Sequence, residues 1–67
     1  MTIYRVDTKM ENPVREHHDL YTNYDAAMSY YNGVKNNANC ISIEVTRLEN
    51  MKGLERLEEV EIVASYS

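Results

Sequence analysis

Residues 16–31, EHHDLYTNYDAAMSYY, decide the fold, because a predicted strand passes into a predicted helix within them. The strand is expected over residues 14–21, which begin after a proline and are polar enough for a sheet edge. The helix is expected over about 23–36, with Thr22 and Asp25 forming a capping box at its start. Helical spacing predicts which side chains face the sheet: Tyr24, Ala27, Met28, Tyr31 and Val34.

Three further segments alternate between apolar and polar residues. Residues 2–9, TIYRVDTK, and residues 40–48, CISIEVTRL, each have one face for a core and one for water, which predicts a strand. Between residue 48 and the last segment, residues 49–53, ENMKG, have the composition of a hairpin loop, with Gly53 where a positive φ is needed. The last segment, 54–67, is expected to be a strand with three apolar side chains on one face: Val60, Ile62 and Ala64. Its beginning also fits a short helical turn, through the spacing of Leu54, Leu57 and Val60.

This element order predicts a single α+β domain over residues 1–67, with a ββαββ plan. Each pair of strands joined by a short turn is antiparallel, and the helix returns the chain so that the third strand can pair beside the first. The expected sheet is therefore four-stranded and antiparallel, in the order 2-1-3-4, with a right-handed crossover. The helix covers one face, and the other face stays open unless a partner covers it.

Composition excludes several classes of protein. The net charge is −4 and the seven basic residues are scattered, whereas nucleic-acid binding needs clustered Lys and Arg. No apolar run approaches the ~20 residues of a membrane span. Cys40 is the single cysteine, so no disulfide can form within the chain, and a reducing compartment such as the cytoplasm is expected. A chain of 67 residues buries a small core, so oligomerisation is one route to stability.

The adjacent histidines suggest a metal site at first sight. Neighbouring residues on a strand point to opposite faces, so His17 and His18 are not expected to bind one ion together. His17 and Asp19 do share a face, but a stable zinc site needs three or four ligands. Cys40 as a nucleophile would need a positioned base, and the histidines lie on a strand two places away. We therefore predict no metal, no cofactor and no catalytic residue, and hence not an enzyme.

Two groups of residues are candidates for binding a protein partner. The first lies on the second strand and the helix, where the strand's residues are expected on the open face and tyrosine is a good interface anchor. The second is the acidic run of the last strand, whose simplest role is to discourage aggregation of a sheet edge. Together these candidates are Arg15, His17, Asp19, Tyr21, Tyr30, Glu58, Glu59 and Glu61.

The segment YDAAMSYYNGVKNNANCISIEV, residues 24–45, joins a tyrosine-flanked helix to a strand. In this segment and in its overall plan, the chain resembles small phage and prophage accessory proteins. That resemblance implies a host-directed binder, such as an inhibitor of a host enzyme or defence complex, acting in the host cytoplasm. It implies no role for any individual residue.

The leading hypothesis is a small cytoplasmic, non-catalytic protein-binding module that acts through the open sheet face or an edge strand. One alternative is a homodimer that pairs its open faces or its last strands, which Leu48 and Val63 on an otherwise polar face would favour. Another is an acidic mimic of nucleic acid that blocks a DNA-binding protein through Glu58, Glu59 and Glu61.

Overall fold

The computed structural model describes residues 1–50 and 56–67, which form four strands and one helix. The strands are β1 (Thr2–Met10), β2 (Arg15–Tyr21), β3 (Cys40–Asn50) and β4 (Leu57–Tyr66), and the helix is α1 (Tyr24–Lys35). The predicted hairpin loop 49–53 and its Gly53 lie largely outside the described residues. The α+β plan is confirmed.

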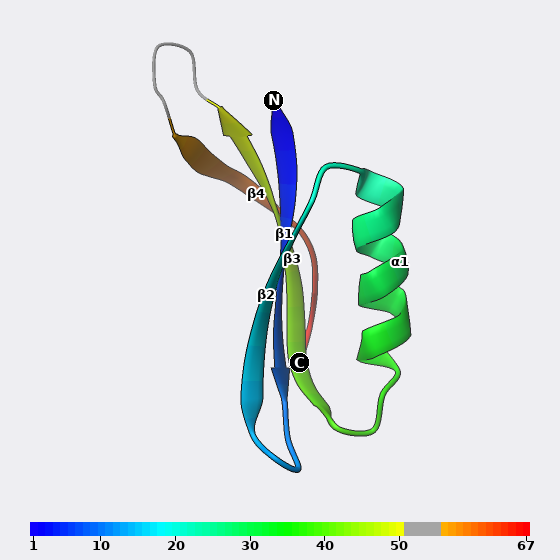
Figure 1. The fold of residues 1–67 in the computed structure, drawn as a ribbon. Helices are drawn as coiled ribbons and strands as arrows, with labels where there is room; N and C mark the ends of the chain where they lie inside the picture. Colours follow the sequence, from blue (N-terminus) through cyan, green and yellow to red (C-terminus); the bar gives the residue numbers. More distant parts are fainter. Residues whose placement is uncertain (51–55) are drawn as a thin grey trace.

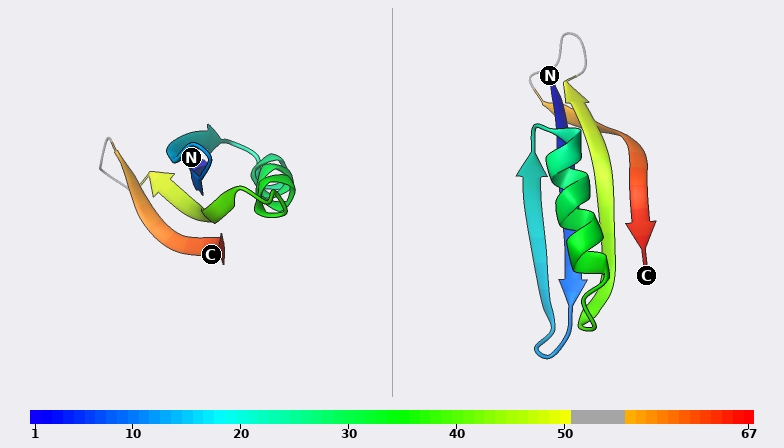
Figure 2. Two further views of the ribbon diagram at one scale, coloured as in Figure 1. Left: turned by 90° about the horizontal axis from the view of Figure 1, so that it is seen from below. Right: turned by 90° about the vertical axis from the view of Figure 1, so that its right-hand side faces the viewer.

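The strands form one antiparallel sheet in the order β2-β1-β3-β4, as predicted. The helix lies against one face of this sheet, and both views of the ribbon show the two layers (Figures 1 and 2). With α1 in front of the sheet, the chain passes from β2 on the left to β3 on the right (Figure 2), so the crossover is right-handed. A single domain therefore results, with a covered face and an opposite face.

The covered face holds the main core, between α1 and the two central strands. Val6, Ile43 and Val45 from the sheet are at most 1% exposed, and Ala27 and Tyr31 from the helix complete the cluster. Full burial of a side chain such as Ile43 contributes about 1.5–3 kcal/mol relative to exposure. The helical stripe predicted from spacing is confirmed, except that Tyr24 is 47% exposed, with its ring edge-on to that of Tyr4 on β1.

The N-cap of the helix lies one residue later in the sequence than predicted. Asn23, not Thr22, is the N-cap, because its backbone is extended and its side-chain oxygen accepts a hydrogen bond from the Ala26 N–H at 3.1 Å. Asn is as good an N-cap as Ser or Asp, so Thr22 and Asn23 were both suitable N-cap residues. Asp25 still lies in the first turn, where the helix dipole favours a negative charge.

The predicted assignment of faces on β2 is wrong. The turn of residues 11–14 sets Met10 opposite Arg15, and this register places His17 opposite Thr8 and Asp19 opposite Val6. Residues directly opposite each other share a face, so the odd-numbered residues of β2 lie on the helix side and the even-numbered ones on the open side. Register, rather than the alternation within β2, decides which set faces the core.

Strand β4 also departs from the expected alternation. Two irregularities interrupt its pairing with β3, one opposite Val45/Thr46 and one opposite Arg47/Leu48. Each inserts an extra residue and reverses the alternation beyond it. As a result Ile62 and Ala64, expected on one face, lie on opposite faces, because they pair with Thr46 and Val45 respectively.

The bulges also bend β4, so the face opposite the helix is only partly open. In both ribbon views the beginning of β4 lies on the side of the sheet away from α1 (Figures 1 and 2). At this end of the sheet Ile3 and Leu48, which pair across β1 and β3, are only 9% and 6% exposed. Leu48 is therefore buried within the chain and does not offer the apolar surface for dimerisation that its position suggested.

Candidate functional site

The uncovered part of the sheet, opposite α1, is the candidate site, and we call it the open face. All four strands supply it, because side chains at alternate positions of each strand point away from the helix. The register across the sheet identifies its members as Arg5, Asp7, Lys9, Glu16, His18, Leu20, Ser42, Glu44, Glu59, Ile62 and Ser65. Thr46 lies on the same side of the sheet but is only 3% exposed.

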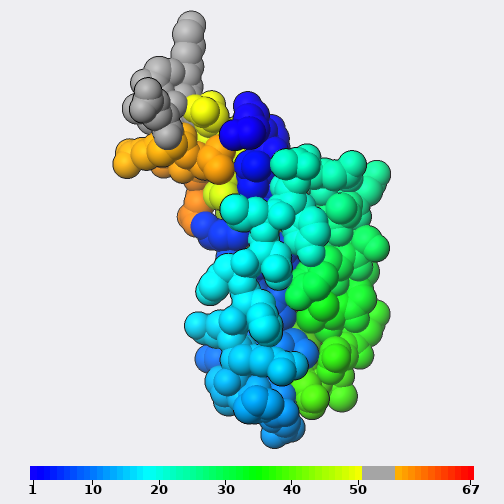
Figure 3. Space-filling model, in the orientation of Figure 1, coloured from blue at the N-terminus to red at the C-terminus, as the bar shows by residue number. Residues whose placement is uncertain are grey.

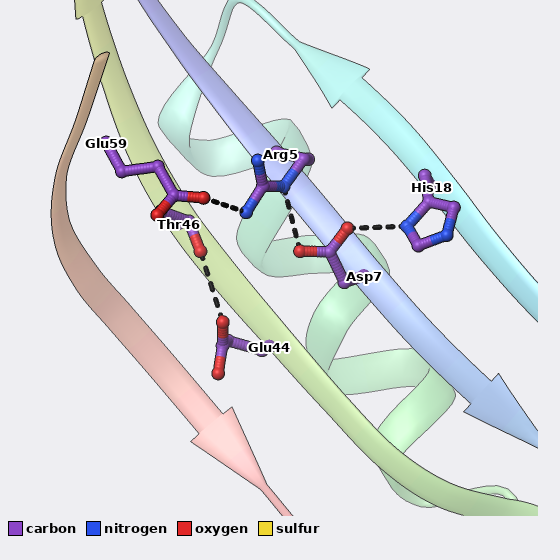
Figure 4. Close-up of polar contacts among 6 residues, drawn as sticks. All are labelled: Arg5, Asp7, His18, Glu44, Thr46 and Glu59. Carbon is purple, nitrogen blue, oxygen red and sulfur yellow. Dashed lines mark hydrogen bonds and ion pairs between the residues drawn. The ribbon is translucent and has the colours of Figure 1, made fainter.

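A chain of hydrogen bonds crosses the open face from β4 to β2 (Figure 4). Arg5 donates to Glu59 at 2.6 Å through Nη2 and to Asp7 at 2.9 Å through Nε. The second carboxylate oxygen of Asp7 lies 2.7 Å from Nδ1 of His18. Four side chains from three strands thus hold one another in defined positions. Each exposed pair contributes only ~0.2–1 kcal/mol, so the main effect is geometric order.

These contacts change the acid–base properties of the two central residues. Hydrogen bonds to Glu59 and then to Asp7 raise the pKa of Arg5, which stays charged. Partial burial alone would raise the pKa of Asp7, but the hydrogen bonds from His18 and Arg5 outweigh it and the pKa lies below its usual value. Asp7 is therefore a carboxylate throughout the neutral range.

Glu44 occupies the middle of the open face, on β3. Its carboxylate accepts a hydrogen bond from the Thr46 hydroxyl at 3.3 Å, and it has no ion pair with a described residue. Shallow depressions of about 200 Å³ and 260 Å³ flank it, the first also lined by Asp7 and His18 and the second by Glu59 and Ile62. The depressions are open and shallow, so they offer contact area and little shelter from water.

Large apolar side chains border this polar centre. Ile62 is 61% exposed and Val60 is 42% exposed on β4, while Leu20 is 64% exposed on β2. Scattered apolar residues are ordinary on a protein surface. Here, however, Val60 and Ile62 line the same depression as Glu44, so apolar and charged groups adjoin at one place.

The predicted partner-binding residues do not come together. Those on β2 and those on β4 lie at opposite edges of the sheet. Arg15, His17 and Asp19 belong to the helix side of β2 and not to the open face, as β2's register with β1 shows. The expected exposed cluster of these residues with Arg5 and Asp7 is therefore wrong, and His18 takes that place.

The two candidate tyrosines pack on each other at the flank of the core. The ring centroids of Tyr21 and Tyr30 lie 5.9 Å apart, and both rings are partly buried against the main cluster. Burial raises the pKa of Tyr21, with smaller contributions from Asp19 and Tyr30. Their first role is to close the gap between α1 and β2.

The acidic run on β4 is paired with arginines of the same chain. Glu59 bonds to Arg5, Glu61 bonds to Arg47 at 2.9 Å, and the Glu58 carboxylate lies 2.8 Å from Arg56. The bond to Glu61 is the main reason that the pKa of Arg47 is raised. Each negative charge thus has a positive neighbour, which reduces the field that the run presents to a distant partner.

His17 and Asp19 share a face of β2, as the alternation predicted, but that face is the one on the helix side. Within residues 1–50 and 56–67 no group of three or more His, Cys, Asp or Glu side chains could hold a metal ion. Cys40 opens β3, where it pairs with Met10, and β1 separates it from the histidines of β2. The one helix of these residues, α1, is neither long nor apolar enough to cross a bilayer.

No family model matches this chain, and the comparisons with curated proteins and with solved structures gave no match. The functional argument therefore depends on the geometry of the open face.

Sequence reasoning left His18, Glu44 and Ile62 out of the candidate binding residues, although it did expect Glu44 to point outward. For Glu44 the signal was present, since it alternates with the buried Ile43 and Val45 on β3. For His18 the only signal was the length of the turn before β2, which sets the register. For Ile62 there was none, because a bulge reverses its face.

Proposed function

We propose that this protein is a small, non-catalytic module that binds another protein through the open face of its sheet. The observation that carries the proposal is the hydrogen-bonded chain from Glu59 through Arg5 and Asp7 to His18, set beside the exposed Ile62. Polar groups that are already ordered lose little conformational entropy on binding, and an adjacent apolar anchor supplies the contact area.

Charge indicates what kind of surface the partner presents. Glu44 forms no ion pair with a described residue, although Lys9 lines the depression on its other side. An Arg or Lys of the partner could pair with Glu44 over the depression that Ile62 lines. The paired state of Glu58, Glu59 and Glu61 argues against the alternative of a nucleic-acid mimic, which needs uncompensated negative charge. The resemblance to phage accessory proteins makes a host enzyme or defence complex the partner that we propose, in a reducing cytoplasm that keeps Cys40 as a thiol.

The test is capture of a partner by the immobilised protein from a lysate of the cells in which it acts, followed by mass spectrometry. The partner should be lost with Glu44→Lys or Ile62→Asp on the open face. It should be kept with Ser29→Lys, an exposed position on the helix.

Capture that survives both open-face variants would overturn the proposal, as would turnover or tight binding of a small metabolite in the absence of any protein partner. Raising the salt concentration should weaken capture only modestly. A steep loss of binding with salt would restore the nucleic-acid mimic as the better explanation.

A further inference from the structure

The second strand of the sheet has a free edge. β2 pairs with β1 on one side without any bulge, and the sheet order leaves its other side without a described neighbour. In Figure 3 its side chains form the near surface, and no other part of the chain covers them. A regular edge strand offers a row of unpaired backbone groups to another strand.

The edge also carries side chains that have no use within the chain. Val14, just before the strand, is 70% exposed and Leu20 is 64% exposed. Arg15, Glu16 and Asp19 form no ion pair with a described residue. The strand of seven residues thus carries one large exposed apolar group and three charges without an ion pair, and a second apolar group directly precedes it.

The sequence of β2 is complementary to a second, antiparallel copy of the same strand. An antiparallel neighbour must pair residues of the same face, so a second copy of β2 can be centred on one residue opposite its own counterpart. With His17 at the centre, Arg15 lies opposite Asp19 of the second copy. In the same alignment Glu16 lies opposite His18, and Val14 opposite Leu20.

Two of these pairs are directly favourable, and symmetry makes each occur twice. Arginine meets aspartate, and the two exposed apolar residues meet each other. Glu16 meets the His18 ring, whose Nδ1 is bonded to Asp7, and the ring can donate to Glu16 as well when both of its nitrogens carry a proton. Opposite charges and apolar pairs across strands contribute roughly 0.2–1 kcal/mol each, in addition to the backbone hydrogen bonds.

Neighbouring alignments lose this complementarity. A centre at residue 16 places Glu16 against its own copy, and a centre at residue 18 places Glu16 against Leu20. The opposite edge, β4, is a poor alternative, because its two bulges break the regular spacing and its acids are already paired with arginines.

We infer that two copies of this chain associate through antiparallel pairing of β2 with β2, centred on His17. The result is one continuous eight-stranded sheet, with both helices on one side and both open faces on the other. Association through β2 gives this small domain the further stabilisation that short chains often obtain from oligomerisation. The inference does not depend on the proposed function, since the pairing uses the β2 edge and leaves Glu44 and Ile62, on β3 and β4, away from it.

Sedimentation equilibrium tests the pairing, with the protomer mass of 7.8 kDa as the reference. The wild type should sediment as a dimer at high concentration. Arg15→Asp and Asp19→Arg should each raise the dissociation constant about tenfold or more, because each sets like charges opposite one another twice. The double variant, with both substitutions, should restore the dimer. Failure of this rescue, or a monomeric wild type at millimolar concentration, would overturn the inference.

A second measurement covers the case in which the charge variants fold poorly. His17→Cys in a Cys40→Ser background should form a disulfide-linked dimer under mild oxidation, because residue 17 faces its own copy. Ser29→Cys in the same background, on the helix, should form far less. Equal cross-linking of the two variants would count against the pairing.

Discussion

The two faces of the sheet are stabilised in different ways. On the covered face, Val6, Ile43 and Val45 are removed from water by α1. On the open face, a chain of charged hydrogen bonds among Arg5, Asp7 and their neighbours holds side chains at 25–63% exposure. The first face supplies stability through burial, and the second supplies order with little stability. A binding surface can therefore change without unfolding the domain.

Two isoleucines give the largest test of this difference. Ile43 is 1% exposed under the helix, and Ile62 is 61% exposed on the open face. Ile43→Ala should lower the free energy of unfolding by about 3 kcal/mol, through lost burial and the cavity it leaves. Ile62→Ala should change it by less than about 0.5 kcal/mol. Urea unfolding followed by circular dichroism measures both, and equal losses would show that the open face is covered in solution.

Two threonines sharpen the comparison at a smaller scale. Both threonines are 3% exposed, but the hydroxyl of Thr8, on the side of the helix, has no hydrogen-bond partner, whereas that of Thr46, on the other side of the sheet, donates to Glu44. Thr8→Val should raise the free energy of unfolding by about 1 kcal/mol, because an unsatisfied polar group is removed. Thr46→Val should lower it by about 1 kcal/mol. Thermal unfolding of both variants decides the point, and destabilisation by Thr8→Val would indicate a partner for its hydroxyl.

Substitution of Asp7 should have the smallest effect on the free energy of unfolding, and this effect should depend on pH. Its pKa is lowered in the folded protein, so the charged carboxylate favours folding. The contribution is complete above the ordinary carboxyl value of about 4 and is lost as the pH falls through the lowered value. Asp7→Asn should cost about 1 kcal/mol at neutral pH and flatten the loss of stability in acid. Denaturant titrations between pH 2 and 7 measure this slope, and an unchanged acid limb would contradict the role given to Asp7.

The fold was predictable from local patterns, and the open face was predictable only in part. Alternation over β1 and β3, and the apolar stripe of α1, led to the observed strand order because these elements have one clearly apolar side. β2 has no such side, since polar residues occupy both of its faces. Its orientation depends on pairing with β1, which no pattern within the strand reveals.

The prediction of which side chains share a face on the last strand, β4, was wrong for a different reason. Val60, Ile62 and Ala64 alternate in the sequence, but the bulges displace the alternation twice, so Ile62 emerges on the open face. Bulges arise from pairing between strands and from bending of the sheet, and neither is encoded in a window of ten residues. The error mattered because it concealed a large exposed apolar side chain of the open face.

The same bulges have a consequence for how far assembly can proceed. A sheet with two regular edges could add copies at both and grow into a fibre without limit. Here one edge is regular and the other is interrupted twice in its ten residues. Growth that begins at β2 therefore has no second regular edge from which to continue, and the assembly closes at two copies.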